Sequence, residues 1–454
     1  MNHSLSDCIK FADETEDLIL KKNAVSEIAD QLKKHFSHET VCIVSDENTQ
    51  IAAGKKAEGI LRDAGIRIDG IHIFPGTPRL NAEYDHIRFL KQWISSLPSF
   101  PSLVPIAIGA GTLNDLVKRS SFELDLQYIC IPTATSVDGF TPNGASLLMD
   151  GFKQTLPCPA PKTLIADTDI IVNAPSYLSS SGFGDLASKI ISGTDWMIAD
   201  RAGTYGASEA HAIVPIAWEM VQNGLLESLQ NSINASRGDA DGVNALFEKL
   251  SITGFAMQYM KNSRPVSGSE HLWSHVWEME TLSVNGVPVT HGHKVTIGTL
   301  AATAFTEIFF KDPKGPPAVS KDFVLPGIEE RKAEVSNAFK GSRAHDKIIE
   351  ASMAKLPDEK TLKLTNEGFR DTWKNIRDRV LEKLLPYKEL KDLLYRAGCP
   401  ITPKEIGISR DYVIATARRA QMIRNKYCIL DLSWNMGNFE SILSDMEKSG
   451  IYLY

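Results

Sequence analysis

Short apolar runs alternate with amphipathic helical segments over the first 175 residues, and this alternation limits the possible folds more than any other feature of the chain. Strands that are apolar throughout and separated by helices form parallel sheets covered on both faces. We therefore predict a doubly wound, Rossmann-like α/β domain over residues 1–175. The expected helices are 23–36, 49–65, 81–97 and one from about Thr112, and the expected strands are 41–46, 66–74, 104–111 and 128–132.

Helical spacing dominates the remainder of the chain, so we predict an all-α domain over residues 176–454. Asn81 is expected to cap the helix of 81–97, and Asn173 to cap the next one, with Pro175 in its first turn. The Pro- and Lys-rich segment 311–323 is expected to be a surface connection. Helices are expected over 210–233, 296–310, 372–384 and 412–427.

Composition excludes several classes of protein. The net charge of −7 gives no basic field that would attract nucleic acid or anionic lipid, so an anionic ligand needs a local site. The six cysteines are far apart and form no C-x-x-C, which argues against a disulfide framework and a zinc ribbon. The acidic N-terminus does not resemble a signal peptide, and no apolar run is long enough to span a membrane. A cytoplasmic location is expected.

A glycine-rich turn joins a predicted strand to a predicted helix in "IAIGAGTLNDLVKRS". Gly109 and Gly111 would leave main-chain N–H groups open to a pyrophosphate at the helix N-terminus, although a plain tight turn is the alternative. Asn114 stands where the dinucleotide fingerprint has its third glycine. Asp46, at the end of an earlier strand, could accept hydrogen bonds from ribose hydroxyls or could simply cap a helix.

A loop of small and hydroxylated residues, "PTATSVDGFTPNGASLL", follows the strand at 128–132. Loops at the carboxyl ends of parallel strands are where such domains bind ligands. Asp138 in this loop is either a substrate contact or a turn residue, and spacing alone leaves both open.

Four of the eleven histidines lie in one short stretch: His271, His275, His291 and His293. His271 and His275 are predicted to share one helix face, and His291 is predicted to begin another helix. Two imidazoles from two helices could bind a divalent ion with Asp185 as third ligand, or the histidines could be structural. The pattern is not the H-E-x-x-H of metalloproteases.

Five ordered motifs together resemble the glycerol-1-phosphate dehydrogenases, bacterial branch: "GAGTLNDLVK", "PTATSVDGF", "GFGDLASK", "SGSEHLWSH" and "HGHKVTIG". These enzymes form one superfamily with iron-type alcohol dehydrogenases, glycerol dehydrogenase and dehydroquinate synthase. The resemblance implies a dehydroquinate synthase-like fold and reduction of dihydroxyacetone phosphate to sn-glycerol 1-phosphate. It also implies NAD, with NADP possible, one zinc or nickel ion, and a homodimer.

The resemblance assigns roles to individual residues. The metal ligands would be Asp185, His271 and His291, and Asp138 and His275 would line the pocket and could relay a proton. The role of His293 stays open. The implied cofactor residues are Asp46, Gly109, Gly111, Thr112, Asp115, Thr133 and Ser136.

A phosphorylated triose needs an anion site in this acidic chain. Arg264 and Ser267 precede the first metal histidine and Lys294 follows the second, which suggests a phosphate site, although Arg264 could also be a surface charge. Three alternatives stay open: a glycerol dehydrogenase acting on an unphosphorylated polyol, a dehydroquinate-synthase-like lyase, and a non-catalytic binding module. The lyase is disfavoured because the loop after Val137 lacks that group's lysine.

Overall fold

The structure is a computed structural model that describes residues 4–37, 40–208, 210–317 and 324–454. Its residues form two compact units. The sheet unit comprises Met1–Met149, Lys153–Leu186 and Glu219–Asn262, and the helical unit comprises Asp150–Phe152, Ala187–Trp218 and Ser263–Tyr454.

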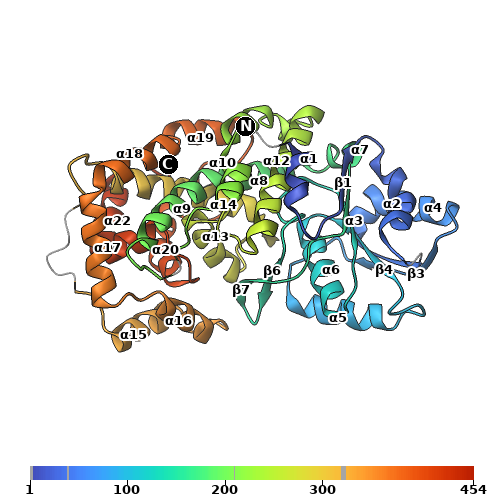
Figure 1. The fold of residues 1–454 in the computed structure, drawn as a ribbon, viewed down its shortest axis with the longest axis horizontal. Helices are drawn as coiled ribbons and strands as arrows, with labels where there is room; N and C mark the ends of the chain where they lie inside the picture. Colours follow the sequence, from blue (N-terminus) through green and yellow to red (C-terminus); the bar gives the residue numbers. More distant parts are fainter. Residues whose placement is uncertain (1–3, 38–39, 209, 318–323) are drawn as a thin grey trace. The chain divides into compact units, whose positions relative to one another are not determined.

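A six-stranded parallel sheet forms the centre of the sheet unit, in the order β1-β8-β5-β4-β2-β3 (Figure 1). This confirms the predicted α/β fold and its parallel strands. The strands are β1 (Asp17–Lys21), β2 (Thr40–Asp46), β3 (Arg67–Phe74), β4 (Val104–Gly109), β5 (Ile129–Pro132) and β8 (Thr163–Asp167).

Helices cover both faces of the sheet, as strand β2 illustrates. Successive side chains of a strand point to opposite faces. Val41 and Ile43 accordingly belong to a core with residues of α2 (Ile28–His35) and α4 (Lys55–Asp63). Cys42 packs instead with Ile94 of α5 (Tyr84–Ser95), in a second cluster. The sheet is therefore doubly wound.

Several details differ from the sequence prediction. Helix α5 begins at Tyr84 with Glu83 at its N-cap, so Asn81 is not the cap. Helix α8 (Ser176–Ala187) begins beyond Asn173, and the helix expected over 49–65 is interrupted by a π-helical segment at Gln50–Gly54. Strands β1 and β8 and the hairpin of β6 (Ala145–Met149) and β7 (Phe152–Leu156) were not predicted.

The helical unit confirms the predicted change to helices, and its only described strands are the short pair β9 (Ser283–Val284) and β10 (Val287–Pro288). Two buried helices, α13 (Ser269–Met279) and α14 (His291–Phe309), pack against each other. Around them are α9 (Lys189–Gly203), α18 (Trp373–Lys383), α19 (Tyr387–Arg396), α20 (Arg410–Met422), α21 (Ile429–Asn435) and α22 (Phe439–Lys448).

Helix α20 packs along α13. The indole N–H groups of Trp273 and Trp277 donate to the Val413 carbonyl oxygen at 2.9 Å and to Thr416 Oγ1 at 3.2 Å. The sequence predicted one helix over 412–427, but α20 ends at Met422. The following residues to Cys428 are irregular, and the predicted connection 311–323 lies partly outside the described residues.

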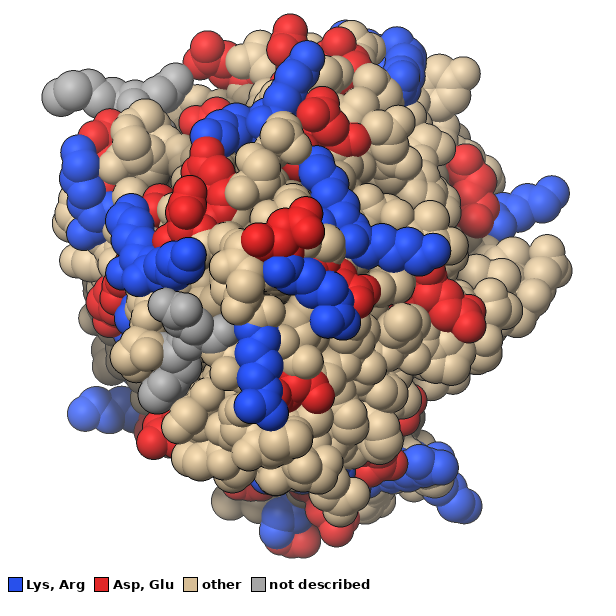
Figure 2. All heavy atoms as spheres, turned by 90° about the vertical axis from the view of Figure 1, so that its right-hand side faces the viewer, with Lys and Arg blue, Asp and Glu red and all other residues tan. Residues whose placement is uncertain are grey.

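Surface features agree with the composition. Lysine and arginine side chains mix with aspartate and glutamate on the face in Figure 2, where no large area has one sign. Ion pairs near the surface, such as Lys34–Asp17 and Arg62–Glu58, join charges of opposite sign. All six cysteines are buried free thiols, and within the described chain no helix combines the length and apolar character needed to cross a membrane.

Candidate functional site

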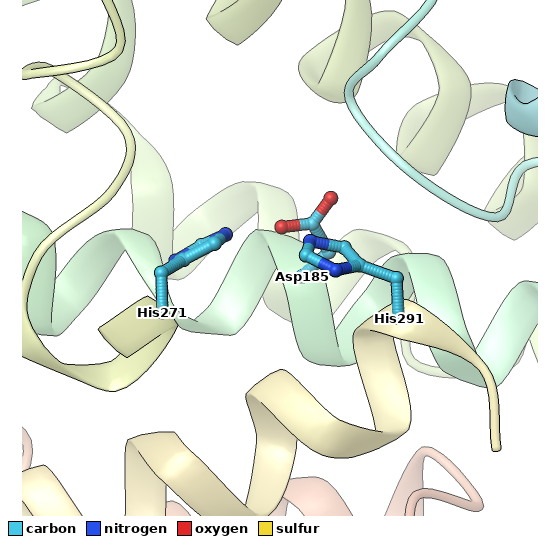
Figure 3. A group of neighbouring side chains, drawn as sticks. All are labelled: Asp185, His271 and His291. Atoms are coloured by element: carbon cyan, nitrogen blue, oxygen red, sulfur yellow. The ribbon is translucent and has the colours of Figure 1, made fainter. Parts of the chain in front are cut away.

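Three side chains that the sequence singled out as metal ligands converge in the structure. Asp185 lies on α8, His271 on α13 and His291 at the first position of α14. One ligand atom from each lies within 4.8 Å of the other two, and Figure 3 shows the side chains pointing toward one another. The expected meeting of two helices through their histidines therefore occurs.

Each of the two histidines is oriented by a glutamate. Nδ1 of His271 lies 2.7 Å from Oε1 of Glu270, and Nδ1 of His291 lies 2.6 Å from Oε1 of Glu278. Both glutamates are buried. A carboxylate that accepts from one ring nitrogen fixes the ring and its tautomer and makes the other nitrogen a better ligand. Nε2 is thus the nitrogen of each ring that is left to bind an ion.

These residues fit a divalent metal ion. Two imidazole nitrogens and one carboxylate oxygen form the donor set of open, catalytic zinc sites, and imidazole also suits nickel. The carboxylate–histidine pairs match the surroundings usual for histidines that bind metal. The sequence did not single out Glu270 and Glu278, although their places directly before His271 and two turns after it could have suggested them.

Glu270 belongs to a buried acidic pair at the start of α13. Burial raises the pKa of Glu270 to about 7, although the hydrogen bond from the Gly268 N–H stabilises the carboxylate and lowers the pKa. Burial and the nearby Glu270 raise the pKa of Asp195 on α9 to about 7. A side chain at Gly268 would collide with both acids, because its Cβ would lie 2.5 Å from Asp195 Oδ2 and 2.8 Å from Glu270 Oε2.

Helix α8 packs closely against the loop that carries Asp138. The Asp138 N–H donates to Asp185 Oδ2 at 3.0 Å, which helps to orient this carboxylate. A Cβ at Gly182 would lie 1.8 Å from the Thr135 carbonyl oxygen, so this helix position requires glycine. Ser181 Oγ also donates to the carbonyl oxygen of Ser136 at 3.1 Å.

The loop itself is braced by a buried lysine that sequence reasoning missed. Lys118 Nζ donates to the carbonyl oxygens of Gly139, Pro142 and Gly144 at 3.0–3.1 Å. Asn114, which replaces the third glycine of the fingerprint, donates to the Gly139 carbonyl oxygen at 2.9 Å. Irregular backbone in the interior needs such partners.

The glycine-rich turn lies where the sequence predicted it, between β4 and α6 (Gly111–Glu123). A Cβ at Gly111 would lie 2.5 Å from Val137 Cγ2, so the turn also requires glycine for its contact with the loop. Burial raises the pKa of Asp115, whose Oδ2 accepts from the Ser146 N–H at 3.2 Å. Thr112 is half-buried in the first turn of α6.

The other implied cofactor residues lie at the carboxyl ends of strands. Asp46 ends β2 and caps α3 (Glu47–Thr49), since Oδ1 accepts from the Thr49 N–H at 2.8 Å. The capping role raised as an alternative is therefore present. The Thr133 N–H donates to the Gly109 carbonyl oxygen at 3.2 Å, and both Thr133 and Ser136 are buried.

The remaining histidines lie near the ligands. The ring of His275 is buried one turn after His271, with ring centroids 5.9 Å apart. The rings of His271 and His291 are 5.3 Å apart. The N–H of His293 donates to the capping side chain of Thr290 at 3.3 Å.

The three residues predicted to bind phosphate form hydrogen bonds or an ion pair within the helical unit. Arg264 is 2% exposed and donates to the Tyr427 carbonyl oxygen at 2.7 Å, so it is not the surface charge considered as an alternative. The Ser267 carbonyl oxygen accepts from Lys426 Nζ at 2.9 Å. Lys294 Nζ lies 3.5 Å from Glu278 Oε1, the atom that also contacts His291.

Comparison with known proteins adds sequence and structural relatives. Residues 19–175 match the family model described as iron-containing alcohol dehydrogenase. The glycerol-1-phosphate dehydrogenase [NAD(P)+] of Bacillus velezensis is 30% identical over 412 residues, covering 91% of this chain and 89% of the relative. The enzyme of that name from Pyrococcus horikoshii is 27% identical over 285 residues, covering 63% and 76%.

Solved structures support the fold. Glycerol dehydrogenase from Schizosaccharomyces pombe aligns with a TM-score of 0.57 at 16% identity, over 96% of this chain and 91% of that one. A probable glycerol dehydrogenase from Sinorhizobium meliloti aligns with a TM-score of 0.60 at 13% identity, over 96% and 99%.

The match to the Bacillus enzyme covers nearly the full length of both chains and so spans the segment from the glycine-rich turn to His291. Membership of this group implies an oxidoreductase that uses NAD(P) and a metal ion, and Asp185, His271 and His291 form a possible metal site. The chain belongs to the glycerol-1-phosphate dehydrogenase family, within the iron-containing alcohol dehydrogenases.

Proposed function

We propose that this protein reduces dihydroxyacetone phosphate to sn-glycerol 1-phosphate with NAD(P)H. The observation that carries the proposal is the convergence of Asp185, His271 and His291 within 4.8 Å, with each histidine oriented by a buried glutamate. The activity named for relatives that align over most of the chain supports the substrate.

The proposed ion is zinc or nickel, bound by these three side chains. When bound, it would supply a Lewis acid for the C2 carbonyl group of the substrate. The protein's part is to fix the ligands: Glu270 and Glu278 orient the two rings, and the Asp138 N–H orients the carboxylate of Asp185. Removal of one such partner typically costs 10–100-fold in metal affinity.

The glycine-rich turn is the proposed site of the cofactor pyrophosphate. Gly109, Gly111 and Thr112 lie where β4 ends and the N–H groups of α6 are open, with Asp115 in the same first turn. Thr133 and Ser136 would line the cofactor from the adjacent loop. Asp46 would accept from the ribose hydroxyls with the oxygen that does not cap α3, which favours NAD over NADP.

Asp138 and His275 are the proposed residues for proton transfer and substrate contact. Both residues lie next to proposed metal ligands. The Asp138 N–H donates to Asp185 Oδ2, and the ring of His275 neighbours that of His271. Either side chain could relay a proton from bound water to the substrate oxygen after hydride transfer.

Arg264, Ser267 and Lys294 are the proposed source of positive charge and hydroxyl groups for the substrate phosphate. Arg264 and Ser267 precede α13, and Lys294 lies in the first turn of α14. A protein with a net charge of −7 needs such local cations to bind an anionic group. The proposal also includes a homodimer, which sedimentation of the purified protein tests.

The test is an NADH-oxidation assay of metal-loaded protein with dihydroxyacetone phosphate, dihydroxyacetone and precursors of dehydroquinate. We expect rapid turnover of dihydroxyacetone phosphate alone and a product with sn-1 stereochemistry. Equal efficiency with dihydroxyacetone would indicate a glycerol dehydrogenase. Absence of turnover with every carbonyl, despite bound metal, would contradict the proposal and favour a binding module.

A further inference from the structure

The irregular segment between α20 and α21, residues 423–428, contains a strained arginine. Arg424 has φ of 58°, in the left-handed region. A residue with a Cβ pays about 1–2 kcal/mol there, and glycine would avoid this cost. Such strain persists where the surroundings impose it, and it gathers at ligand sites. The position of Arg424 therefore calls for a reason beyond chain connection.

Several bonds fix this segment beside the start of α13. Lys426 Nζ donates to Ser263 Oγ at 3.0 Å and to the Ser267 carbonyl oxygen at 2.9 Å. Arg264 donates in return to the Tyr427 carbonyl oxygen. Asp195 accepts from the N–H groups of both Ser269 and Ile429, at 2.6 and 2.8 Å, and so connects α13 to α21. The segment is consequently rigid next to the helix that carries His271.

Arg424 differs from these neighbours because its charge has no direct partner. Its Nε is buried without a hydrogen-bond partner, and so is Oδ1 of Asn425. Within the part of the chain that the structure describes, no carboxylate forms an ion pair with Arg424. Desolvation lowers the pKa of Arg424 to about 10, although the charge of Glu278 opposes the shift. Arg424 as a whole is half-buried, but a buried nitrogen without a hydrogen-bond partner, such as its Nε, is costly and rare in folded proteins.

The charged groups that act on Arg424 and its neighbour Lys426 include two arginines and Glu278. Burial is the largest cause that lowers the pKa of Lys426, and the positive charges of Arg264 and Arg424 lower it further. Glu278, whose charge reaches Arg424, contacts Nδ1 of His291. Lys426 and Arg264 donate hydrogen bonds to main-chain oxygens of the protein, whereas Arg424 Nε has no partner and could donate to a ligand.

We propose that Arg424 binds the phosphate group of the substrate, with Asn425 as a second polar contact in the same segment. The inference rests on the proposed function, since it names the side chain that recognises the phosphomonoester. A guanidinium matches phosphate geometry through two parallel hydrogen bonds, which a lysine cannot reproduce. Arg424 then makes the direct contact, while Arg264 and Lys426 hold the segment and Arg264 contributes the positive charge proposed for the phosphate site.

Arg424→Gly is the most informative variant, because glycine removes the guanidinium and also relieves the left-handed backbone. Its thermal midpoint should stay level or rise. Arg424→Asn is a second variant that tolerates this backbone, and Arg424→Lys restores a point charge. Arg418→Gln is the matched control, since Arg418 is an exposed residue of α20 paired with Glu440.

Three measurements on metal-loaded enzyme test the proposal: KM for dihydroxyacetone phosphate, kcat/KM for dihydroxyacetone, and Ki for inorganic phosphate. In Arg424→Gly we expect KM and Ki to rise about 10- to 100-fold, as for a lost charged hydrogen bond. The kcat/KM for dihydroxyacetone and the metal content should stay unchanged. Arg424→Lys should recover part of the loss, and Arg418→Gln should match the wild type.

An unchanged KM and Ki in Arg424→Gly would overturn the inference while leaving the proposed function intact. Equal losses for both substrates, together with lost metal, would also overturn it, because Arg424 would then act through Glu278. If the wild type fails to prefer the phosphorylated substrate, the proposed function falls. A rise in Ki for inorganic phosphate in Arg424→Gly would in that case still support the anion site.

Discussion

The loop at 133–144 in the sheet unit and helix α13 in the helical unit both carry predicted site residues, but different bonds fix them. The loop is fixed through its main chain: Lys118 donates to three of its carbonyl oxygens and Gln258 Nε2 to the Thr141 carbonyl oxygen at 2.7 Å. On α13, His271 is fixed through its side chain, by the contact of its Nδ1 with Glu270.

The two regions are fixed differently because the loop has irregular backbone and α13 has helical backbone. Irregular backbone that is buried must satisfy every carbonyl and N–H group, so its partners stabilise the fold as well as the shape of the loop. A helix satisfies its own backbone, so its polar side chains are available to orient one chosen atom. Substitutions in the loop braces should therefore reduce stability first, and substitutions around His271 and His291 should reduce metal binding first.

The largest expected effect is in His271→Ala, which tests the helical side of the comparison. Loss of one of three protein ligands should remove the metal and lower turnover by about 10³-fold or more, while the fold survives. Elemental analysis and activity on the same preparation provide the measurement. His345→Ala on α16 (His345–Ala354) is the control, and full metal content with near-normal turnover in His271→Ala would refute the ligand assignment.

Lys118→Met tests the sheet side. Three carbonyl oxygens would lose their donor, so the free energy of unfolding should fall by about 3 kcal/mol or more. Urea denaturation measures the change, with Lys34→Met as control because the exposed Lys34–Asp17 pair should contribute at most about 1 kcal/mol. Unchanged stability with lost metal would reverse the comparison.

Glu278→Ala tests whether side-chain contacts on the helical side act on metal binding, because it removes the group that orients His291 and leaves all three proposed ligands in place. Metal affinity should fall about 10- to 100-fold. Glu278→Gln should recover part of the affinity, since its amide oxygen can still accept from His291 Nδ1. Competition with a chelator measures both variants. Loss of stability without loss of affinity would show that Glu278 only supports packing.

The smallest expected effect is in Asp46→Asn, at the end of β2. Asparagine keeps the cap of α3 but removes the charge that opposes a 2′-phosphate, so the ratio of kcat/KM for NADPH to that for NADH should rise about tenfold. Asp46→Ala should in addition lower stability by about 1 kcal/mol through loss of the cap. A wild-type preference for NADPH would contradict the proposed role.

The sequence could predict the parallel sheet because buried strands are apolar on both faces, as β4 and β5 are. Strand β1 was missed because its residues are only half-buried or exposed, which weakens the apolar signal. The helix predicted over 412–427 extends too far, because α20 ends at Met422. Helical spacing continues past Met422, but tertiary bonds from Lys426 and Tyr427 to the start of α13 end the helix there and leave Arg424 outside it.

By itself, the sequence determined that His271 and His275 share a helix face and that His291 begins a helix, because these relations depend only on helical periodicity and capping. Only the tertiary structure decided which atoms meet. The approach of Asp185, the pairing of each histidine with a glutamate and the close contact at Gly182 depend on rotamers and on packing between segments distant in sequence. Local periodicity carries no information about such contacts, since each is fixed by the shape of the whole core.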